Sequence, residues 1–137
     1  MEFFQLTYQS KAVSSLDEND LNAILESATK NNAIYNITGC LVYYKGNFVQ
    51  ILEGTRDEVY IIYNKIIEDN RHASIDLLWE CEAEQRFFKD WNMGFYRPSS
   101  EDETLFKTNY QLLSSLSERS NAILLSFWSA VDRALDF

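Results

Sequence analysis

Apolar and polar positions follow two different periods along this chain, and the change of period marks the predicted elements. Residues Phe3–Tyr8 alternate as in a β-strand, with Phe4, Leu6 and Tyr8 on one face. The spacing then changes to three and four residues, which predicts a helix with an apolar face of Leu21, Ile24, Leu25 and Ala28. Ser15–Glu18 matches a capping box at the start of this helix, and polar residues 30–32 suit its end.

The next segment predicts a hairpin. Two apolar runs, Ile37–Tyr44 and Phe48–Leu52, flank the turn Lys45–Asn47, which contains a glycine and an asparagine. Alternation places Gln50 in the middle of an apolar row. Either this glutamine lies at a strand edge and reaches solvent, or its amide is buried and finds hydrogen-bond partners.

A second helix and two more strands follow. Thr55–Glu58 matches a capping box, and the helix after it has an apolar face of Val59, Ile62, Tyr63, Ile66 and Ile67. Ile75–Ala83 alternates as a strand, and a short last strand is expected within Trp91–Tyr96. The order β-α-β-β-α-β plus one strand predicts an α+β, ferredoxin-like fold with both helices on one face.

The hairpin strands carry apolar residues on both faces, which a sheet covered on one side does not need. The cover is expected from residues after Pro98, where Ser100–Glu103 matches a helix cap and leucines recur at helical spacing. A further helix is predicted over residues 121–135. This helical pair would either cover the open face or bind a partner. We therefore expect a main domain over residues 1–97 and a helical extension over residues 98–137 of the same compact unit.

Composition excludes several classes of protein. The 137 residues carry a formal net charge of −9, which argues against binding to nucleic acid. No apolar run is long enough to span a membrane, and the N-terminus does not resemble a signal peptide. Cys40 and Cys81 have no metal-binding spacing and are expected as reduced thiols, which suggests a cytoplasmic protein. A single histidine makes a histidine-based metal site improbable, and the common nucleotide, metalloprotease and hydrolase motifs are absent.

Three polar residues could form a site on the helix-covered face. Tyr8 shares a face with Phe4 and Leu6, and neighbouring strands could bring its hydroxyl to the Gln50 amide; Asn32 lies where the first helix ends. These residues could bind a ligand or form a satisfied core pair. Lys65 and Arg71 could hold an anionic group, or they could be ordinary exposed charges.

Five segments resemble BLUF domains, the blue-light sensors that use FAD. The segments occur in the family's order and at its spacing over residues 1–96. They are LTYQS around Tyr8, Asn32 followed by its NITG motif, FVQILEG around Gln50, DNRH at Asp69–His72 and RFFKDWNMGF at Arg86–Phe95.

The resemblance implies a role for particular residues. The flavin ring would lie between the helices, with Ile24 and Ile66 on its two sides and Leu41 and Phe48 nearby. Asn32 would bond the polar edge of the ring, and Gln50 would bridge the ring and Tyr8. Two positions depart from the common pattern: Ala28 stands where a serine is frequent, and Asn31 where some members have a histidine. The phosphates would meet Arg71, Lys65 and His72.

The resemblance also implies how the protein works. Tyr8 would donate an electron to the excited flavin while Gln50 relays the proton, and the rearranged glutamine would shift the absorption to the red. The signal would pass through Trp91 and Met93 to the C-terminal helices and a separate signalling protein. We expect a non-enzymatic photoreceptor that binds FAD, or else FMN or riboflavin, and that forms homo-oligomers. The alternatives are a flavin-free interaction module and a small ferredoxin-like enzyme such as an acyl-phosphate hydrolase.

Overall fold

A computed structural model of the chain describes residues 3–12, 17–44, 46–69, 72–86, 88 and 94–96. One sheet contains five strands: β1 (Phe3–Ala12), β2 (Thr38–Tyr44), β3 (Asn47–Gly54), β4 (His72–Ala83) and β5 (Gly94–Tyr96). Helix α1 (Glu18–Ile34) connects β1 to β2, and α2 (Arg56–Glu68) connects β3 to β4. The predicted α+β order of elements is therefore confirmed.

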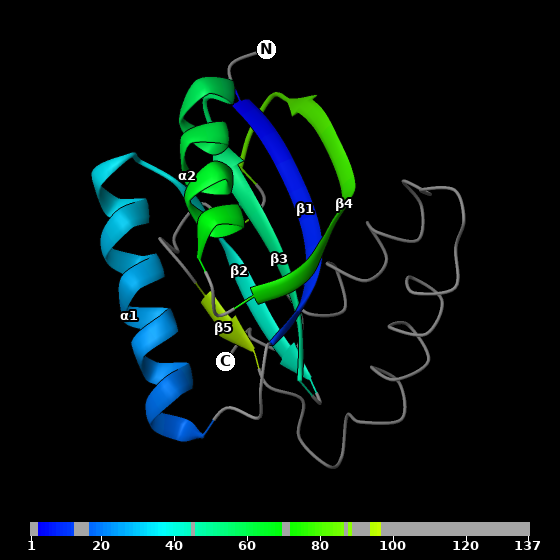
Figure 1. Cartoon of the computed structure of the whole chain (residues 1–137). Helices are drawn as coiled ribbons and strands as arrows, with labels where there is room; N and C mark the ends of the chain where they lie inside the picture. Colours follow the sequence, from blue (N-terminus) through cyan, green and yellow to red (C-terminus); the bar gives the residue numbers. More distant parts are fainter. Residues whose placement is uncertain are drawn as a thin grey trace. The chain divides into compact units, whose positions relative to one another are not determined.

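The strands lie in the order β4-β1-β3-β2-β5 (Figure 1). β1 pairs antiparallel with both β3 and β4, and β2 pairs antiparallel with β3. Each helix joins two strands that are separated by one other strand, which gives the ferredoxin-like order β4-β1-β3-β2. Tyr8 of β1 and Gln50 of β3 lie opposite each other in the pair of these two strands.

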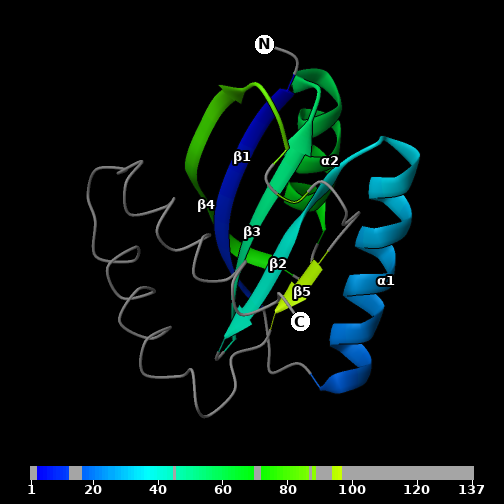
Figure 2. The ribbon, with the colours of Figure 1, turned by 180° about the vertical axis from the view of Figure 1, so that it is seen from behind.

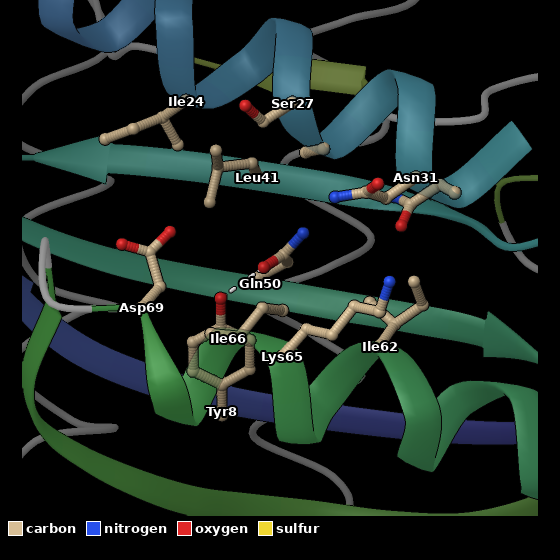
Figure 3. A pocket seen from close by; sticks show the side chains of 12 residues that line it. Tyr8, Ile24, Ser27, Asn31, Leu41, Gln50, Ile62, Lys65, Ile66 and Asp69 are labelled. Atoms are coloured by element: carbon tan, nitrogen blue, oxygen red, sulfur yellow. Dashed lines mark hydrogen bonds between the residues drawn. The ribbon is translucent and has the colours of Figure 1, made fainter.

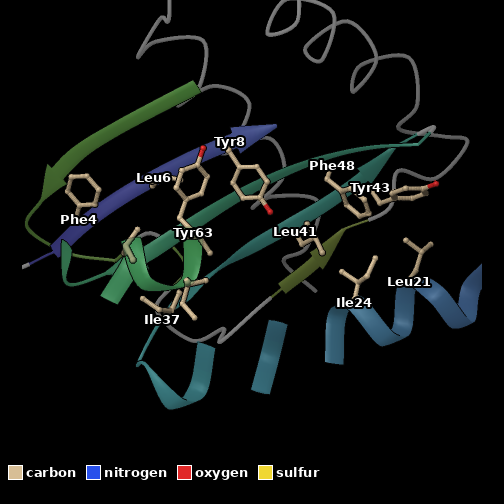
Figure 4. Close-up of a cluster of buried hydrophobic side chains, with 13 residues drawn as sticks. Phe4, Leu6, Tyr8, Leu21, Ile24, Ile37, Leu41, Tyr43, Phe48 and Tyr63 are labelled. Atoms are coloured by element: carbon tan, nitrogen blue, oxygen red, sulfur yellow. The ribbon is translucent and has the colours of Figure 1, made fainter. Parts of the chain in front are cut away.

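Both helices cover the same face of the sheet, as two opposite views show (Figure 1 and Figure 2). The core lies between the helices and this face (Figure 4). The helices contribute Leu21, Ile24, Val59, Ile62 and Tyr63, and the strands contribute Phe4, Leu6, Tyr8, Leu41, Tyr43, Phe48 and Leu52. The predicted alternation in β1 and β3 is confirmed, because Phe4, Leu6 and Tyr8 of β1 and Phe48 and Leu52 of β3 belong to this core.

The first predicted helix cap was wrong. The N-cap of α1 is Asp17, whose side chain accepts a 2.8 Å hydrogen bond from the Asp20 backbone N–H, while the Asp20 carboxylate accepts one from the Asp17 N–H. Two carboxylates thus make the reciprocal bonds that were assigned to Ser15–Glu18. The helix also extends to Ile34, beyond its predicted end, and Asn36 follows it with a φ of 54°.

The remaining elements differ from the prediction mainly in length. β1 and β4 are longer than predicted, because β1 continues to Ala12 and pairs there with His72 at the start of β4. Thr55 is the N-cap of α2, as predicted, and accepts a hydrogen bond from the Glu58 N–H. β5 falls within the predicted last strand, but residues 91–93 lie outside the described part.

The opposite face of the sheet is also buried in its centre. Cys40, Val42, Val49 and Ile51 are each at most 4% exposed. The predicted helices after Pro98 that would cover this face lie outside the described residues, so that prediction stays untested. Every described side chain belongs to the unit Met1–Phe95. Among the described helices, none is long and apolar enough to cross a membrane.

A buried carboxylate lies on this opposite face. Glu53 is 0% exposed and accepts hydrogen bonds from Gln5 Nε2 at 3.2 Å, Thr38 Oγ1 at 3.1 Å and the Phe88 backbone N–H at 2.8 Å. Arg86 donates to Thr38 Oγ1 and to the Glu53 carbonyl oxygen. These bonds tie the chain that follows β4 to the three central strands of the sheet.

Candidate functional site

A pocket opens between the two helices above the centre of the sheet (Figure 3). Its volume is about 530 Å³ when the open space at its mouth is counted. Residues from both helices and from β1, β2 and β3 line it: Tyr8, Ile24, Ser27, Ala28, Asn31, Asn32, Leu41, Gln50, Ile62, Lys65, Ile66 and Asp69.

A tyrosine–glutamine pair forms the floor of this pocket. Tyr8 and Gln50 are 0% and 3% exposed, and the Tyr8 hydroxyl donates a hydrogen bond to Gln50 Oε1. The buried interpretation of Gln50 is therefore confirmed, and the strand-edge interpretation was wrong. In Figure 3 the Gln50 nitrogen points from this bond toward the pocket, where an amide N–H can donate to a ligand.

The environment of Tyr8 keeps its phenol protonated. Burial is the largest effect and raises the pKa of Tyr8 far above its ordinary value, and the neighbouring Tyr63 and Asp69 raise it further. The phenol proton is therefore present at all physiological pH values. The negative charge of Asp69 that disfavours a phenolate also stabilises a positive charge on the same ring.

The walls of the pocket are apolar where the helices face each other. Ile24 of α1 and Ile66 of α2 lie on its two sides, and Leu41 of β2 lies between them on the sheet (Figure 3). Ile24 and Leu41 are 6% and 2% exposed, so their side chains are already fixed by the core. Such a slot fits a flat aromatic ring, whose two faces contact aliphatic side chains.

Amide side chains provide the polar groups at one end of the slot. Asn31 and Asn32 of α1 line the pocket, and Asn32 is 1% exposed. Asparagine and glutamine each present a donor and an acceptor. The edge of an isoalloxazine ring alternates carbonyl oxygens with ring nitrogens that donate or accept, so the donor set of Asn31, Asn32 and Gln50 fits this ring.

Three residues of the pocket were not predicted from the sequence. Ser27 and Ile62 occupy helix positions three and four residues from Ile24 and Ile66, so helical spacing could have indicated them. Asp69 is the C-cap of α2, where its backbone N–H bonds the Ile66 carbonyl oxygen. Its carboxylate and the Lys65 ammonium give the pocket one charge of each sign.

Other predicted site residues lie elsewhere or outside the described part. Phe48 is fully buried but does not line the pocket; its ring packs against that of Tyr43, with 5.0 Å between centroids. Arg71, Trp91 and Met93 and the side chain of His72 are not described. Ala28 lines the pocket with its methyl group, where a serine would add a hydroxyl.

Comparisons with known proteins identify the same family as the sequence motifs. The profile of the family BLUF, "Sensors of blue-light using FAD", matches residues 3–94. The photoactivated adenylate cyclase subunit beta of Euglena longa is 38% identical over 89 residues, which are 64% of this chain and 10% of that protein. The corresponding subunit of Euglena gracilis is 37% identical over 89 residues, with the same coverage. The chain thus spans about a tenth of the length of these relatives.

Solved structures share the fold over more of the chain. The structure titled "BlsA photo-activated state" has a TM-score of 0.78 and 27% identity, and the match covers 91% of each chain. "BlrB - a BLUF protein, dark state structure" has a TM-score of 0.74 and 29% identity, covering 85% of this chain and 86% of that one. A bacterial light-regulated adenylyl cyclase has a TM-score of 0.74 and 32% identity, covering 82% of this chain but 34% of its own.

Proposed function

The chain belongs to the BLUF family of blue-light sensors that bind a flavin, and from this premise we propose that it is a blue-light photoreceptor switched by Tyr8 and Gln50. The BLUF domain is a photosensor module and has no catalytic activity of its own. The observation that carries the proposal is the buried hydrogen bond from Tyr8 to Gln50 at the floor of the pocket between the helices. When bound, the flavin supplies the absorption of blue light and a strong one-electron oxidant.

Tyr8 is the electron donor in this proposal. Its phenol is neutral, lies at the pocket floor and is near the negative charge of Asp69, which stabilises the positive charge left by electron loss. The phenol proton already points along a hydrogen bond to Gln50 Oε1. Loss of an electron makes this proton strongly acidic, so electron loss and proton transfer to Gln50 are coupled.

Gln50 changes its hydrogen bonds in response. Its amide accepts from Tyr8 through the oxygen and has its nitrogen toward the pocket, so a rotated or tautomeric amide presents a different donor to the ligand. A new hydrogen bond from Gln50 to a carbonyl of the bound ring would shift the absorption to the red. Because Gln50 is 3% exposed, water does not compete for the bond, and the two arrangements are distinct states.

The ligand is FAD in this proposal, with FMN and riboflavin as the other candidates. Ile24 and Ile66 would contact the two ring faces, Leu41 and Ala28 the ring's side, and Asn31 and Asn32 its polar edge. Lys65, together with Arg71 and His72, would contact the phosphates. Release of the bound flavin by denaturation and its separation by chromatography identifies which of the three is present.

The signal would leave the site through Trp91 and Met93 and then through the helices predicted after Pro98. Relatives named as light-regulated cyclases suggest that BLUF domains act on an effector, and we propose that this domain signals to a partner protein. We also propose a homo-oligomer in the cytoplasm. In hydrogen exchange, illumination should change the protection of residues 98–137 in the wild type, and Met93→Ala should abolish that change. Unaltered light-dependent protection in the variant would remove Met93 from the route.

The deciding experiment is an absorption spectrum of the purified protein in the dark and after blue light. We expect a flavin spectrum that moves to the red on illumination and returns in darkness. Gln50→Leu should still bind flavin, because the slot formed by Ile24, Ile66 and Leu41 is unchanged, but should lose the red shift. Bleaching in place of a shift, or no flavin after reconstitution, would contradict the proposal.

A further inference from the structure

A row of tyrosine rings leads from the pocket floor toward the surface. The ring of Tyr63, on α2, lies 5.6 Å from that of Tyr8 between centroids, and the ring of Tyr60 lies 6.2 Å from that of Tyr63. Tyr8 and Tyr63 lie beside each other in the core (Figure 4). Tyr8 is 0% exposed and Tyr63 8%, whereas Tyr60 is partly exposed. The three phenols therefore connect a buried site to the solvent.

The outer end of this row has a carboxylate as its partner. The Tyr60 hydroxyl donates a hydrogen bond to Glu80 on β4, and Glu80 is exposed. This bond is the largest of the effects that raise the pKa of Tyr60. The inner end differs, because Tyr8 donates to the neutral amide of Gln50. A carboxylate is a far stronger base than an amide oxygen.

We propose that Tyr8, Tyr63 and Tyr60 form a path that carries a one-electron oxidation from the pocket to the surface, with Glu80 as the final proton acceptor. The path rests on the proposed function, which supplies the oxidant: the light-excited flavin at Tyr8. Illumination would then have two outcomes, the rearrangement of Gln50 and an oxidation that travels along this path. Light would then also oxidise one-electron donors in solution, such as ascorbate or a thiol, at Tyr60.

Electrons and protons balance along this path. Tyr8 would lose one electron to the excited ring and its proton to Gln50, and would regain both when Tyr63 supplies an electron and Gln50 returns the proton. Tyr63 would in turn regain one electron from Tyr60. The Tyr60 O–H bond then breaks, its proton forms an O–H bond with the Glu80 carboxylate, and Tyr60 is left as a neutral phenoxyl radical. The external donor gives Tyr60 one electron, and Glu80 returns the proton. The net change is one electron moved from the donor to the flavin.

The proton partner decides where the oxidation comes to rest. A phenol that has lost an electron is stabilised most when a base takes its proton, and Glu80 offers that base at Tyr60. Asp69 instead favours oxidation of Tyr8, because its negative charge stabilises a positively charged Tyr8 ring. Arg56, 5.9 Å from the Tyr60 ring, also disfavours a positive charge there, but not the neutral radical that remains after proton transfer.

The test maps radicals on the illuminated, flavin-loaded protein. A nitroso spin trap is added during illumination, and mass spectrometry locates the adduct. We expect an adduct on Tyr60 in the wild type, its loss in Tyr63→Phe, which breaks the row while keeping the ring, and its persistence in the control Tyr35→Phe. An undiminished adduct on Tyr60 in Tyr63→Phe, or no adduct on Tyr60 in the wild type, would overturn the path.

A second readout needs no flavin. In the flavin-free protein, Glu80→Gln removes the carboxylate beside Tyr60, so one phenol should titrate at lower pH in ultraviolet absorption, whereas Glu82→Gln on the same strand should titrate like the wild type. A titration of Glu80→Gln that coincides with the wild type would overturn the role of Glu80. A reversible red shift without the Tyr60 adduct would refute the path alone, whereas failure to bind flavin would refute the proposed function and the path together.

Discussion

Replacing Tyr8 by phenylalanine removes one oxygen atom and tests the stability of the site and its function together. The ring is 0% exposed and belongs to the core, so the substitution keeps the apolar packing and opens no large cavity. What is lost is the hydrogen bond from the hydroxyl to Gln50 Oε1. Both groups are buried, so water cannot replace the donor without disturbing the core.

The expected loss in the free energy of unfolding follows from this burial. Removing one partner of a buried hydrogen bond costs about 1–3 kcal/mol, and about 1.4 kcal/mol changes the folding equilibrium tenfold. We expect the free energy of unfolding of the flavin-free protein to fall by that amount. Tyr35→Phe is the matched control. Tyr35 is only partly buried and its ring would still contact Lys65, so the change should stay within about 0.5 kcal/mol.

The assay combines urea unfolding with the light response. Unfolding is measured without flavin, because a ligand that binds only the folded state would add its own stabilisation. The loaded variant is then illuminated: we expect bound flavin with no reversible red shift, because phenylalanine cannot donate the electron and proton. A normal red shift in Tyr8→Phe would refute the role of Tyr8 as donor. A loss of stability no larger than that of Tyr35→Phe would refute the contribution assigned to the hydrogen bond.

Three further predictions concern the fold around the site. Glu53→Gln places an NH₂ group among three donors and should destabilise the protein by about 1–3 kcal/mol, whereas exposed Glu82→Gln should change it by less than about 0.5 kcal/mol in the same urea assay. Gly39→Ala should destabilise the protein more than Gly46→Ala, as measured by thermal unfolding. A Cβ at position 39 would lie 1.9 Å from the Ile51 carbonyl oxygen, whereas a Cβ at position 46 meets no atom within 4 Å and only the φ of 81° there is unfavourable. Above pH 10, near the pKa of an unfolded tyrosine, the unfolded chain releases the Tyr8 proton and the folded chain keeps it, so the free energy of unfolding should fall as the pH rises. Tyr8→Phe should reduce the slope of this fall by up to about 1.4 kcal/mol per pH unit. Equal slopes in the wild type and the variant would refute the raised pKa of Tyr8.

Short-range pattern was enough to place the strands and the faces of their residues. Alternation in Phe3–Tyr8 and Phe48–Leu52 put Tyr8 and Gln50 on the helix-covered face, and pairing of β1 with β3 then sets them opposite each other. Helical spacing likewise put Ile24 and Ile66 on the inner faces of their helices. These features depend on backbone geometry that repeats every two or 3.6 residues, so the sequence contains them directly.

The local sequence pattern did not identify the N-cap of α1 or the length of β4, because more than one solution suits the local sequence. Ser15 and Asp17 are both suitable N-caps, and only the observed bonds between Asp17 and Asp20 identify where α1 begins. The length of β4 depended on its partner: β1 continues to Ala12 and pairs with His72, although residues 72–74 have no strand pattern of their own. Pairing across strands therefore extended an element that local preference would have ended sooner.

The sequence by itself determined the order of elements, the two-faced strands and the set Tyr8, Asn32 and Gln50 as site candidates. Only the tertiary structure decided that Asp69 reaches the pocket and that Tyr63 and Tyr60 continue the row from Tyr8 to Glu80. The physical reason is distance along the chain. Periodicity fixes which face a side chain takes, but contacts between residues tens of positions apart exist only after the helices have packed on the sheet.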